Sequence, residues 1–269
     1  MESPFLKRIV TSRKRRVEEL KVSVPLDTIR QAAEARSDYR DFAGALSGGG
    51  LRVIAELKRA SPSRGLICAH YRRREIAESY ERAGAAALSV LTEEEFFLGS
   101  LADLHAIREA VRLPVLRKDF IIDDYQVYES AASGADALLL IVAALDDKDL
   151  KRLLELSVRL RVAPLVEVHT EPELERALAA GAHIVGVNNR DLDSFEVSLE
   201  TSFKLREKIP ASCLTISESG IKSGHDLERL AAAGFHAVLI GERLMTSSDP
   251  GNALERLLES APSLRMARI

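Results

Sequence analysis

The sequence is poor in several residue types, and each shortage narrows what the protein can be. It has no tryptophan and only 5% aromatic residues, which argues against a surface that stacks on nucleic-acid bases. Its two cysteines, Cys68 and Cys213, form no CxxC motif, so we expect a reducing compartment and no disulfide framework. No apolar run approaches the length of a membrane span, and the N-terminus has no apolar signal-peptide core. We therefore predict a cytoplasmic protein with no membrane or nucleic-acid partner.

Motifs for metals and nucleotides are also missing. The six histidines show no HxxxH or HxH spacing and no cysteine–histidine cluster occurs, so we expect no metal site. The sequence contains no GxGxxG, GxxxxGK[ST] or GxSxG motif, which removes the usual signatures of dinucleotide, nucleotide and serine-hydrolase sites. The net charge of −3 argues against a general polyanion binder, and we interpret the basic run at residues 12–16 as a solvated helix face.

Eight short apolar runs alternate with segments of helical spacing. Gly84, Gly134, Gly181 and Gly234 each follow a helical segment and precede the next run, which indicates a repeated βα unit. Continuous apolar strands with helices between them indicate a parallel sheet covered on both faces. We predict a (β/α)8 TIM barrel, and an eight-stranded open sheet is the alternative. The predicted strands begin at residues 51, 87, 114, 136, 163, 183, 213 and 236.

Residues 1–50 lie outside this repeat. Two segments, 5–20 and 26–46, have helical spacing, and a glycine-rich connector at residues 47–50 follows them. We predict an N-terminal helical extension over residues 1–50 and a barrel domain over residues 51–269. The extension is expected to pack on the barrel and to cover the substrate.

The predicted strands end in ionisable side chains, and in a parallel barrel such ends meet at one mouth. Glu56 and Lys58 share one face of the first strand because side chains alternate along a strand. Burying either charge unpaired is costly, so the charges belong either to ion pairs that close the barrel or to a substrate pocket. Because several ionisable residues end different strands at the same mouth, we favour the substrate pocket. The polar residues at these ends include Glu56, Lys58, Lys118, Glu167, Asn188 and Arg190.

A second polar group follows the last two predicted strands. The segments SESGI (217–221) and LIGERLM (239–245) each place a glycine and polar donors where a helix is expected to start. Backbone N–H groups at a helix N-terminus favour anions, and phosphate sites after strands 7 and 8 are common in such barrels. The sequence therefore predicts a phosphate site, with Ser61 and Ser63 as further hydroxyl donors. Because no base lies near Ser219, we interpret it as a phosphate donor and not as a nucleophile.

These motifs occur in an order that is typical of one family. The segments IAELKRASPSRG, ALSVLTEEEFFLGS, PVLRKDFI, PLVEVH, IVGVNNRDL, SESGI and LIGERLM lie between residues 51 and 250. They closely resemble indole-3-glycerol-phosphate synthase, a lyase of tryptophan biosynthesis. The resemblance implies a (β/α)8 barrel and no cofactor. It also implies conversion of 1-(2-carboxyphenylamino)-1-deoxyribulose 5-phosphate to indole-3-glycerol phosphate, with loss of carbon dioxide and water.

The resemblance further implies roles for individual residues. We expect Lys118 to be the general acid and Glu167 the general base, with Lys58 sharing acid work and Glu56 orienting the lysines. A lysine in a cationic, partly desolvated pocket is expected to have a pKa lowered towards neutrality. Asn188 is assigned to the reacting end. The substrate-binding residues implied are Ser61, Leu91, Phe97, Phe120 and Arg190, and the phosphate-binding residues are Ser219, Gly220, Gly241 and the backbone of Glu242.

Two other functions fit part of the pattern. Phosphoribosylanthranilate isomerase is another phosphate-binding barrel, but its chemistry asks for a Cys/Asp pair, and neither Cys68 nor Cys213 ends a predicted strand. A non-catalytic barrel that binds a sugar phosphate predicts ligand binding without turnover. The expected partner is a small phosphorylated aromatic aminosugar, and the protein is expected to be a monomer or a weak homodimer.

Overall fold

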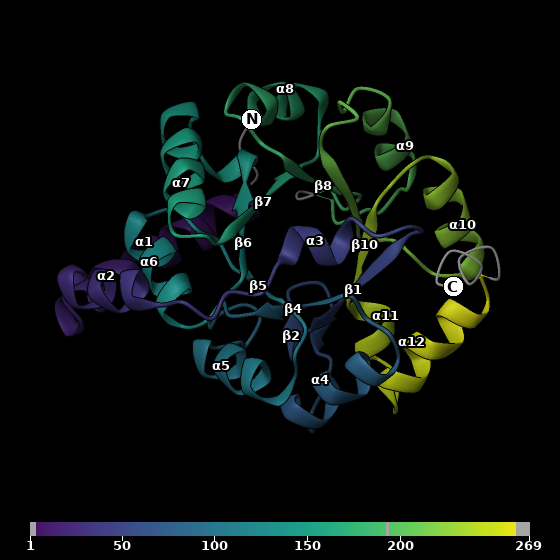
Figure 1. Cartoon of the computed structure of the whole chain (residues 1–269), viewed down its shortest axis with the longest axis horizontal. Coiled ribbons are helices and arrows are strands. Elements are labelled where there is room, and N and C mark those ends of the chain that lie inside the picture. The colour runs from purple at the N-terminus through teal and green to yellow at the C-terminus, as the bar shows by residue number, and fades with distance from the viewer. Residues whose placement is uncertain (1–3, 192–193, 262–269) are drawn as a thin grey trace.

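The computed structural model describes residues 4–191 and 194–261 and contains a closed barrel of eight parallel strands (Figure 1). Ile54 of the first strand pairs with Ala87 of the second barrel strand and with Leu239 of the last, which closes the barrel. The predicted (β/α)8 barrel is confirmed, and the open sheet is excluded. The barrel strands are β1 (Arg52–Leu57), β4 (Ala87–Leu91), β5 (Val115–Lys118), β6 (Ala137–Ile141), β7 (Ala163–Val168), β8 (Ile184–Asn188), β9 (Leu214–Glu218) and β10 (Ala237–Ile240).

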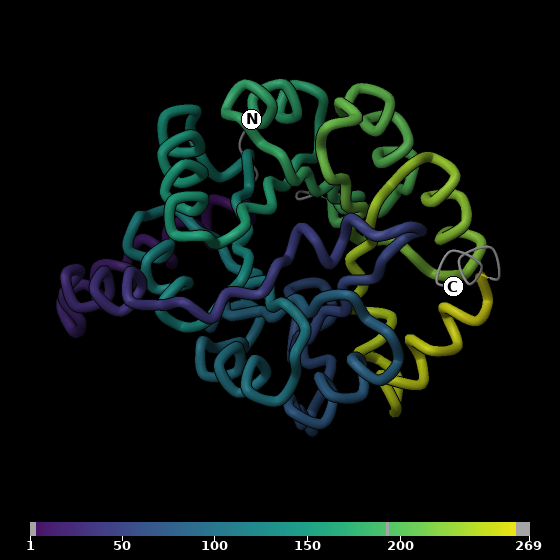
Figure 2. The backbone as a smooth tube through the Cα atoms, viewed as in Figure 1, coloured from purple at the N-terminus to yellow at the C-terminus, as the bar shows by residue number. Residues whose placement is uncertain are grey.

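Helices surround the barrel, as the backbone trace shows (Figure 2). The predicted glycine caps are confirmed, because Gly84, Gly134, Gly181 and Gly234 all have φ between 82° and 91°. Within the described part of the chain, no helix has the length and apolar character needed to cross a bilayer. The outer helices are α4 (Arg73–Arg82), α5 (Leu101–Ala110), α6 (Asp124–Ala132), α7 (Asp147–Arg159), α8 (Glu171–Ala179), α9 (Glu200–Arg206), α10 (Gly224–Ala232) and α12 (Pro250–Glu259). The shorter elements are β2 (Ala60–Ser61), β3 (Gly65–Leu66), η1 (Val142–Ala144) and α11 (Glu242–Met245).

The apolar interior of the barrel determines where the charged side chains lie. Ile54, Leu116, Leu165 and Ile216 belong to one buried cluster inside the barrel. Each precedes an ionisable residue by two positions, and the alternation of side chains therefore places that residue on the same inner face. The inward-facing ionisable residues are Glu56, Lys118, Glu167 and Glu218.

The predicted helix over residues 26–46 is interrupted. The structure has α2 (Leu26–Ala35) and α3 (Phe42–Leu46), and residues 36–41 between them are not helical. Arg36 in this break is held by Asp136, with Nη2 and Oδ1 2.8 Å apart. The helical prediction is wrong for this stretch because the contacts of Arg36 on the barrel outweigh local helical spacing.

Helix α3 closes one end of the barrel. Figure 1 shows it lying across the barrel centre, and Phe42 and Leu46 join the apolar cluster inside the strands. Asp41 caps the helix by accepting the backbone N–H of Gly44 at 2.8 Å. Helix α3, the part of the predicted extension that follows α2, therefore covers one end of the barrel. The division of the chain at residue 50 stays a prediction, and residues 1–3 and 262–269 of the two predicted domains lie outside the described residues.

Helix α1 (Pro4–Ser23) packs on the loops that follow the barrel strands. Nη2 of Arg13 lies 3.0 Å from Oδ2 of Asp119, the residue after β5, and the two side chains are 4% and 0% exposed. Nε of Arg16 lies 2.8 Å from Oε2 of Glu94, in the loop after β4. Nη2 of Arg15 also lies 3.6 Å from Oε2 of Glu95. All three arginines of the basic run are thus paired with acidic groups of the barrel, and Arg13 is buried and not solvated as predicted.

We expect Arg13→Ala to lower the free energy of unfolding by about 3 kcal/mol, because it breaks a fully buried ion pair. Arg15→Ala is the matched control on the same helix, since Arg15 is 71% exposed and should contribute less than about 1 kcal/mol. Urea denaturation of both variants checks this expectation. Equal losses would show that Arg13 contributes no more than a surface arginine.

Candidate active site

Three ionisable side chains meet at the mouth of the barrel. Lys118 ends β5, and its ammonium donates a hydrogen bond of 2.8 Å to Oε2 of Glu167, on β7. The same ammonium contacts Oε2 of Glu218, on β9. The side chains of both glutamates are at most 3% exposed, and that of Lys118 is 13% exposed. The structure brings Lys118 and Glu167 together and adds Glu218 to them.

The surroundings of Lys118 keep it charged. Burial by itself lowers the pKa of a lysine, but the carboxylates of Glu167, Glu218 and Glu56 outweigh burial and raise the pKa of Lys118 above its ordinary value. The expectation of a pKa lowered towards neutrality is wrong, because the pocket is acidic and not cationic. At neutral pH the side chain is therefore an ammonium that can donate a hydrogen bond or a proton.

The two carboxyl groups that contact Lys118 differ in their pKa. For Glu167, the charges of Lys118 and His169 outweigh burial and lower the pKa to about 2. For Glu218, burial and the nearby carboxylates of Glu167 and Glu56 outweigh Lys118 and raise the pKa to about 7. Paired carboxyl groups with separated pKa values are a common basis of acid–base chemistry. Glu167 is the ionised member of the pair, whereas Glu218 takes up a proton as the pH falls through about 7.

A second ion pair lies at the end of β1. Nζ of Lys58 is 3.0 Å from Oε1 of Glu56, and the two side chains are 13% and 6% exposed. Ser89 of β4 donates a hydrogen bond of 3.4 Å to Oε2 of Glu56. Gly241 leaves the space that Glu56 occupies, since a Cβ there would lie 2.3 Å from Oε1. This pairing explains how a buried apolar strand can end in two opposite charges.

Gly186 of β8 makes room for Glu218 in the same way. An added Cβ would lie 2.3 Å from Oε1 of Glu218, whose other oxygen contacts Lys118. We expect Gly186→Ala to displace this carboxylate and to lower turnover about tenfold. A double-mutant cycle with Glu218→Ala measures the coupling, and the glycine substitution should cost much less when the carboxylate is absent. Equal costs in both backgrounds would contradict the displacement.

Asn188 and Arg190 lie at and after the end of β8. The Asn188 amide hydrogen-bonds the carboxylate of Glu167, and its Oδ1 accepts the backbone N–H of Arg190 at 3.1 Å. Nη2 of Arg190 lies 3.3 Å from Oε2 of Glu242, and Nη2 of Arg64 lies 2.9 Å from Oε1 of that carboxylate. These contacts join the ends of β7 and β8 to the loop after β1 and to α11.

The three residues predicted to face an aromatic ring lie near Lys118. Leu91 ends β4, is buried, and pairs in register with Lys118 of β5. The half-buried rings of Phe97 and Phe120 have centroids 6.2 Å apart. Oε2 of Glu93 accepts the backbone N–H of Phe97 at 3.0 Å and so holds this loop in place. Leu91 and Lys118 therefore lie side by side at the ends of neighbouring strands, and the two phenylalanine rings lie next to each other.

The predicted phosphate residues after β9 form a tight turn. Ser219 and Gly220 both have positive φ, at 68° and 84°. The sequence predicts that they begin the next helix, but α10 begins only at Gly224. Ser223 caps α10 in a capping box, which leaves the two earlier residues outside the helix. A positive φ at a residue other than glycine is typical of functional turns.

The remaining predicted phosphate residues lie in two segments. Gly241 directly precedes α11, which begins at Glu242, so the prediction of a helix start is confirmed here. Ser61 belongs to β2 and is 7% exposed, and its Oγ lies 3.4 Å from Oγ of Ser63. Since β9 and β10 pair side by side, the segments that follow these two strands begin next to each other.

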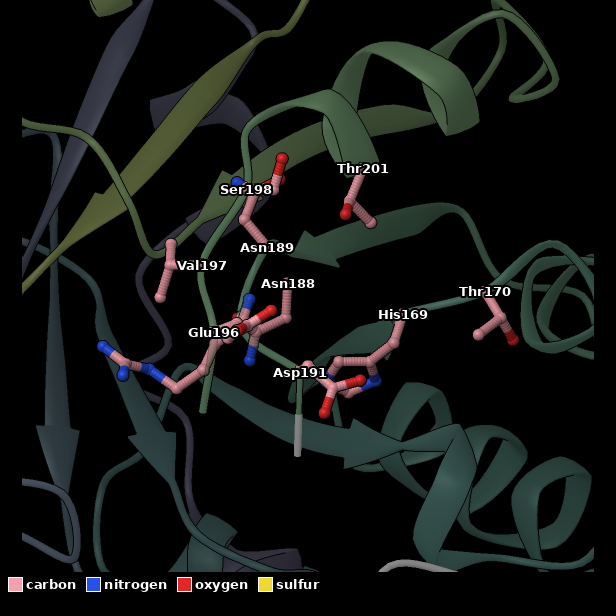
Figure 3. Close-up of a pocket in the computed structure, with 10 residues that line it drawn as sticks. His169, Thr170, Asn188, Asn189, Asp191, Glu196, Val197, Ser198 and Thr201 are labelled. Carbon is pink, nitrogen blue, oxygen red and sulfur yellow. The ribbon is translucent and has the colours of Figure 1, made fainter. Parts of the chain in front are cut away.

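A cavity of about 420 Å³ opens at the ends of β7 and β8 (Figure 3). This volume is within the range of small-molecule sites. Asn188 and Arg190 are the predicted site residues that line it, whereas the side chains of Lys118 and Glu167 do not. The rest of the lining is mostly polar and includes His169, Thr170, Asp191, Glu196, Ser198 and Thr201.

Comparison with known sequences matches this chain to one family. A family model described as Indole-3-glycerol phosphate synthase matches residues 6–257. The chain belongs to the indole-3-glycerol phosphate synthase family. A relative with that name from Polaromonas naphthalenivorans is 47% identical over 259 residues, which cover 95% of this chain and 98% of the relative. Another from Chloroherpeton thalassium is 51% identical over 247 residues, which cover 90% of this chain and 95% of the relative.

Solved structures outside the indole-3-glycerol phosphate synthase family share the fold. KGPDC from Streptococcus mutans aligns with a TM-score of 0.62 at 14% identity, over 80% of this chain and 99% of its own. The 3-hexulose-6-phosphate synthase of Salmonella typhimurium aligns with a TM-score of 0.63 at 12% identity, over 79% and 99%. At such low identity the similarity supports a shared barrel fold and nothing about function.

Sequence reasoning placed Glu218 at the end of the seventh predicted strand but gave it no role, and it missed His169. Alternation would have found Glu218, because it follows the inward-facing Ile216 by two positions, as Glu167 follows Leu165. His169 comes after Val168, where β7 ends, and the alternation of a strand predicts nothing beyond its last residue.

Proposed function

We propose that this member of the indole-3-glycerol phosphate synthase family closes the indole ring of 1-(2-carboxyphenylamino)-1-deoxyribulose 5-phosphate. The products are indole-3-glycerol phosphate, carbon dioxide and water. The observation that carries the proposal is the ammonium of Lys118, held at the barrel mouth between Glu167 and Glu218. Ring closure followed by dehydration requires an acid and a base within reach of one substrate, and this cluster supplies both.

Lys118 is the general acid in the proposed first step. The ring carbon that carries the carboxylate bonds to the ribulose carbonyl carbon, and the carbonyl oxygen takes a proton and becomes a hydroxyl. The raised pKa of Lys118 keeps its ammonium available for this oxygen at neutral pH. Lys58 holds the substrate carboxylate or shares the acid work, and Glu56 orients Lys58 through the contact of 3.0 Å.

Glu167 is the general base in the later steps. When carbon dioxide leaves, the electron pair of the broken bond stays in the ring and restores its aromaticity. Dehydration then requires a base that takes a proton from the substrate and an acid that protonates the leaving hydroxyl. The ionised carboxylate of Glu167 suits the first task, and the lysines suit the second.

The remaining residues bind and orient the two ends of the substrate. Binding both ends brings the reacting atoms together, which can contribute several kcal/mol to catalysis (about 7 or more in favourable cases). In this proposal Asn188 and Arg190 hold polar groups, and Leu91, Phe97 and Phe120 pack on the aromatic ring. The phosphate is bound by Ser61, Ser219, Gly220, Gly241 and the backbone N–H of Glu242.

Incubation of the purified protein with the carboxyphenylamino substrate tests the proposal. Indole fluorescence should rise in proportion to the carbon dioxide released. Tight binding without fluorescence would favour a non-catalytic sugar-phosphate barrel. Turnover of phosphoribosylanthranilate alone would favour the isomerase.

We infer that the reaction takes place in the cytoplasm, since the two cysteines suit a reducing compartment. The proposed partner is the small phosphorylated substrate, with no nucleic acid, and the proposed oligomeric state is a monomer or a weak homodimer. Size-exclusion chromatography with light scattering measures the last point.

A further inference from the structure

His169 lies directly after β7, and its two ring nitrogens face two different carboxylates. Nδ1 is 3.2 Å from Oε2 of Glu173, on α8, and the same oxygen accepts the backbone N–H of His169 at 2.7 Å. Nε2 lies 3.5 Å from Oε1 of Glu167. The side chain is 10% exposed, and among residues 4–191 and 194–261 the buried Nε2 has no hydrogen-bond partner. Two carboxylate acceptors favour the imidazolium form of the ring, which carries a proton on each nitrogen.

This contact distinguishes the two carboxyl groups that share Lys118. Both Glu167 and Glu218 are buried and both contact the same ammonium, so neither burial nor Lys118 explains why only one of them is readily ionised. Glu167 has the additional charge of His169 at one oxygen and the hydrogen bond of the Asn188 amide, whereas Oε1 of Glu218 is buried with no hydrogen-bond partner among the described residues. Their pKa values move in opposite directions, as these surroundings require.

We propose that His169 is a positioning residue that, as an imidazolium anchored by Glu173, stabilises the carboxylate of Glu167 more than that of Glu218. Its catalytic consequence rests on the proposed function, because Glu167 is the proposed base. His169 acts through Glu167 and takes no part in bond making. The distribution of charge between the two glutamates exists in the free protein and can be measured without substrate.

The groups around His169 determine the direction of its pH dependence. Burial lowers the pKa of His169, but Glu173, Glu167 and Glu218 outweigh burial and raise the pKa above its ordinary value. A raised pKa means that the imidazolium is fully present at low pH and is lost as the pH rises through that pKa. The other charged groups near it are Lys118, which contacts Glu167, and the cavity-lining residues Asp191, Glu196 and Arg190.

The direct test is a titration of the glutamate carboxyl carbons by ¹³C NMR in the full chain. In the wild-type protein Glu218 should titrate near neutral pH, while Glu167 stays ionised down to acid pH. His169→Gln keeps a neutral hydrogen-bond donor but removes the charge. It should raise the midpoint of Glu167 by about one pH unit and that of Glu218 by less, because the imidazole lies against Glu167. Glu167→Gln and Glu218→Gln assign the two signals.

The second test follows the titration of the His169 ring by ¹H NMR. Glu173→Gln removes the anchoring carboxylate and should lower the pKa of His169 by about one unit while it leaves KM within about twofold. His105→Gln is the matched control, because His105 is 67% exposed and should change neither titration.

An unchanged midpoint of Glu167 in H169Q, in a variant that still folds, would overturn the proposal. So would a His169 titration in E173Q identical to that of the wild type, which decides the question if H169Q does not fold. If the substrate is not converted at all, the proposed function fails, and the carboxyl titrations still decide the role of His169.

Discussion

Replacing Lys118 by methionine is expected to lower turnover by roughly 100-fold or more, with a much smaller effect on KM. Methionine keeps the apolar stem but removes the ammonium that contacts both Glu167 and Glu218. The substrate carbonyl then loses its proton donor, and two buried carboxyl groups face each other with no cation between them. Indole fluorescence under saturating substrate measures kcat, and the proposed phosphate-binding residues, which are not altered, should keep KM close to its normal value.

Two further variants serve as a control for K118M and as a comparison between the two lysines. Lys151→Met is the matched control, because Lys151 is exposed on α7 and should turn over like the wild type. Lys58→Met separates the two lysines, and a loss as large as that of K118M would indicate shared acid work. Turnover of K118M close to that of the wild type would remove Lys118 from the acid role.

Glu167→Gln is the second substitution with a large expected effect, again roughly 100-fold on kcat. The amide of glutamine has nearly the same shape as the carboxyl group and can still accept a hydrogen bond from Lys118. It cannot take a proton from the substrate. Because the pKa of Glu167 is lowered to about 2, the wild-type carboxylate is ionised at any pH used for the assay. The loss should therefore persist across the neutral pH range and should not be recovered by raising the pH.

The same substitution at Glu218 provides the sharpest comparison. Glu218 contacts the same ammonium, but its pKa is raised to about 7, so below neutral pH it mostly holds a proton, which an amide can imitate. Glu218→Gln should accordingly lose much less turnover than Glu167→Gln at pH 6. A larger loss for Glu218→Gln would exchange the roles of the two residues, and an unaffected rate for Glu167→Gln would exclude it as the base.

Much of the fold was predictable because the barrel repeats one local pattern. Each apolar strand is followed by a helical segment and a glycine such as Gly134, whose φ of 91° suits few other residues. The same regularity placed Lys118 and Glu167 at the barrel mouth, since each follows an inward-facing leucine by two positions. Alternation along a strand is a local property, and it determines the face on which a side chain lies wherever the strand is regular.

Predictions failed where contacts distant in the sequence decide the outcome. Residues 36–41 have helical spacing, yet Arg36 binds Asp136, 100 residues away, and the helix is interrupted. The pKa of Lys118 is predicted to fall, but it rises because Glu167 and Glu218, 49 and 100 residues away, contact its ammonium. Neither the interruption of the helix nor the raised pKa can be predicted from the residues that neighbour Arg36 or Lys118 in the sequence.

The sequence by itself determined the eight strands, the inward face of each, and which polar residues end them, because these depend on residue type and on spacing within one segment. Only the tertiary structure decided which of those polar groups touch one another and which carboxyl group carries the charge. The reason is physical: ionisation of a buried group depends on the charges within a few ångströms of it, and closure of the barrel brings those charges from strands far apart in the chain.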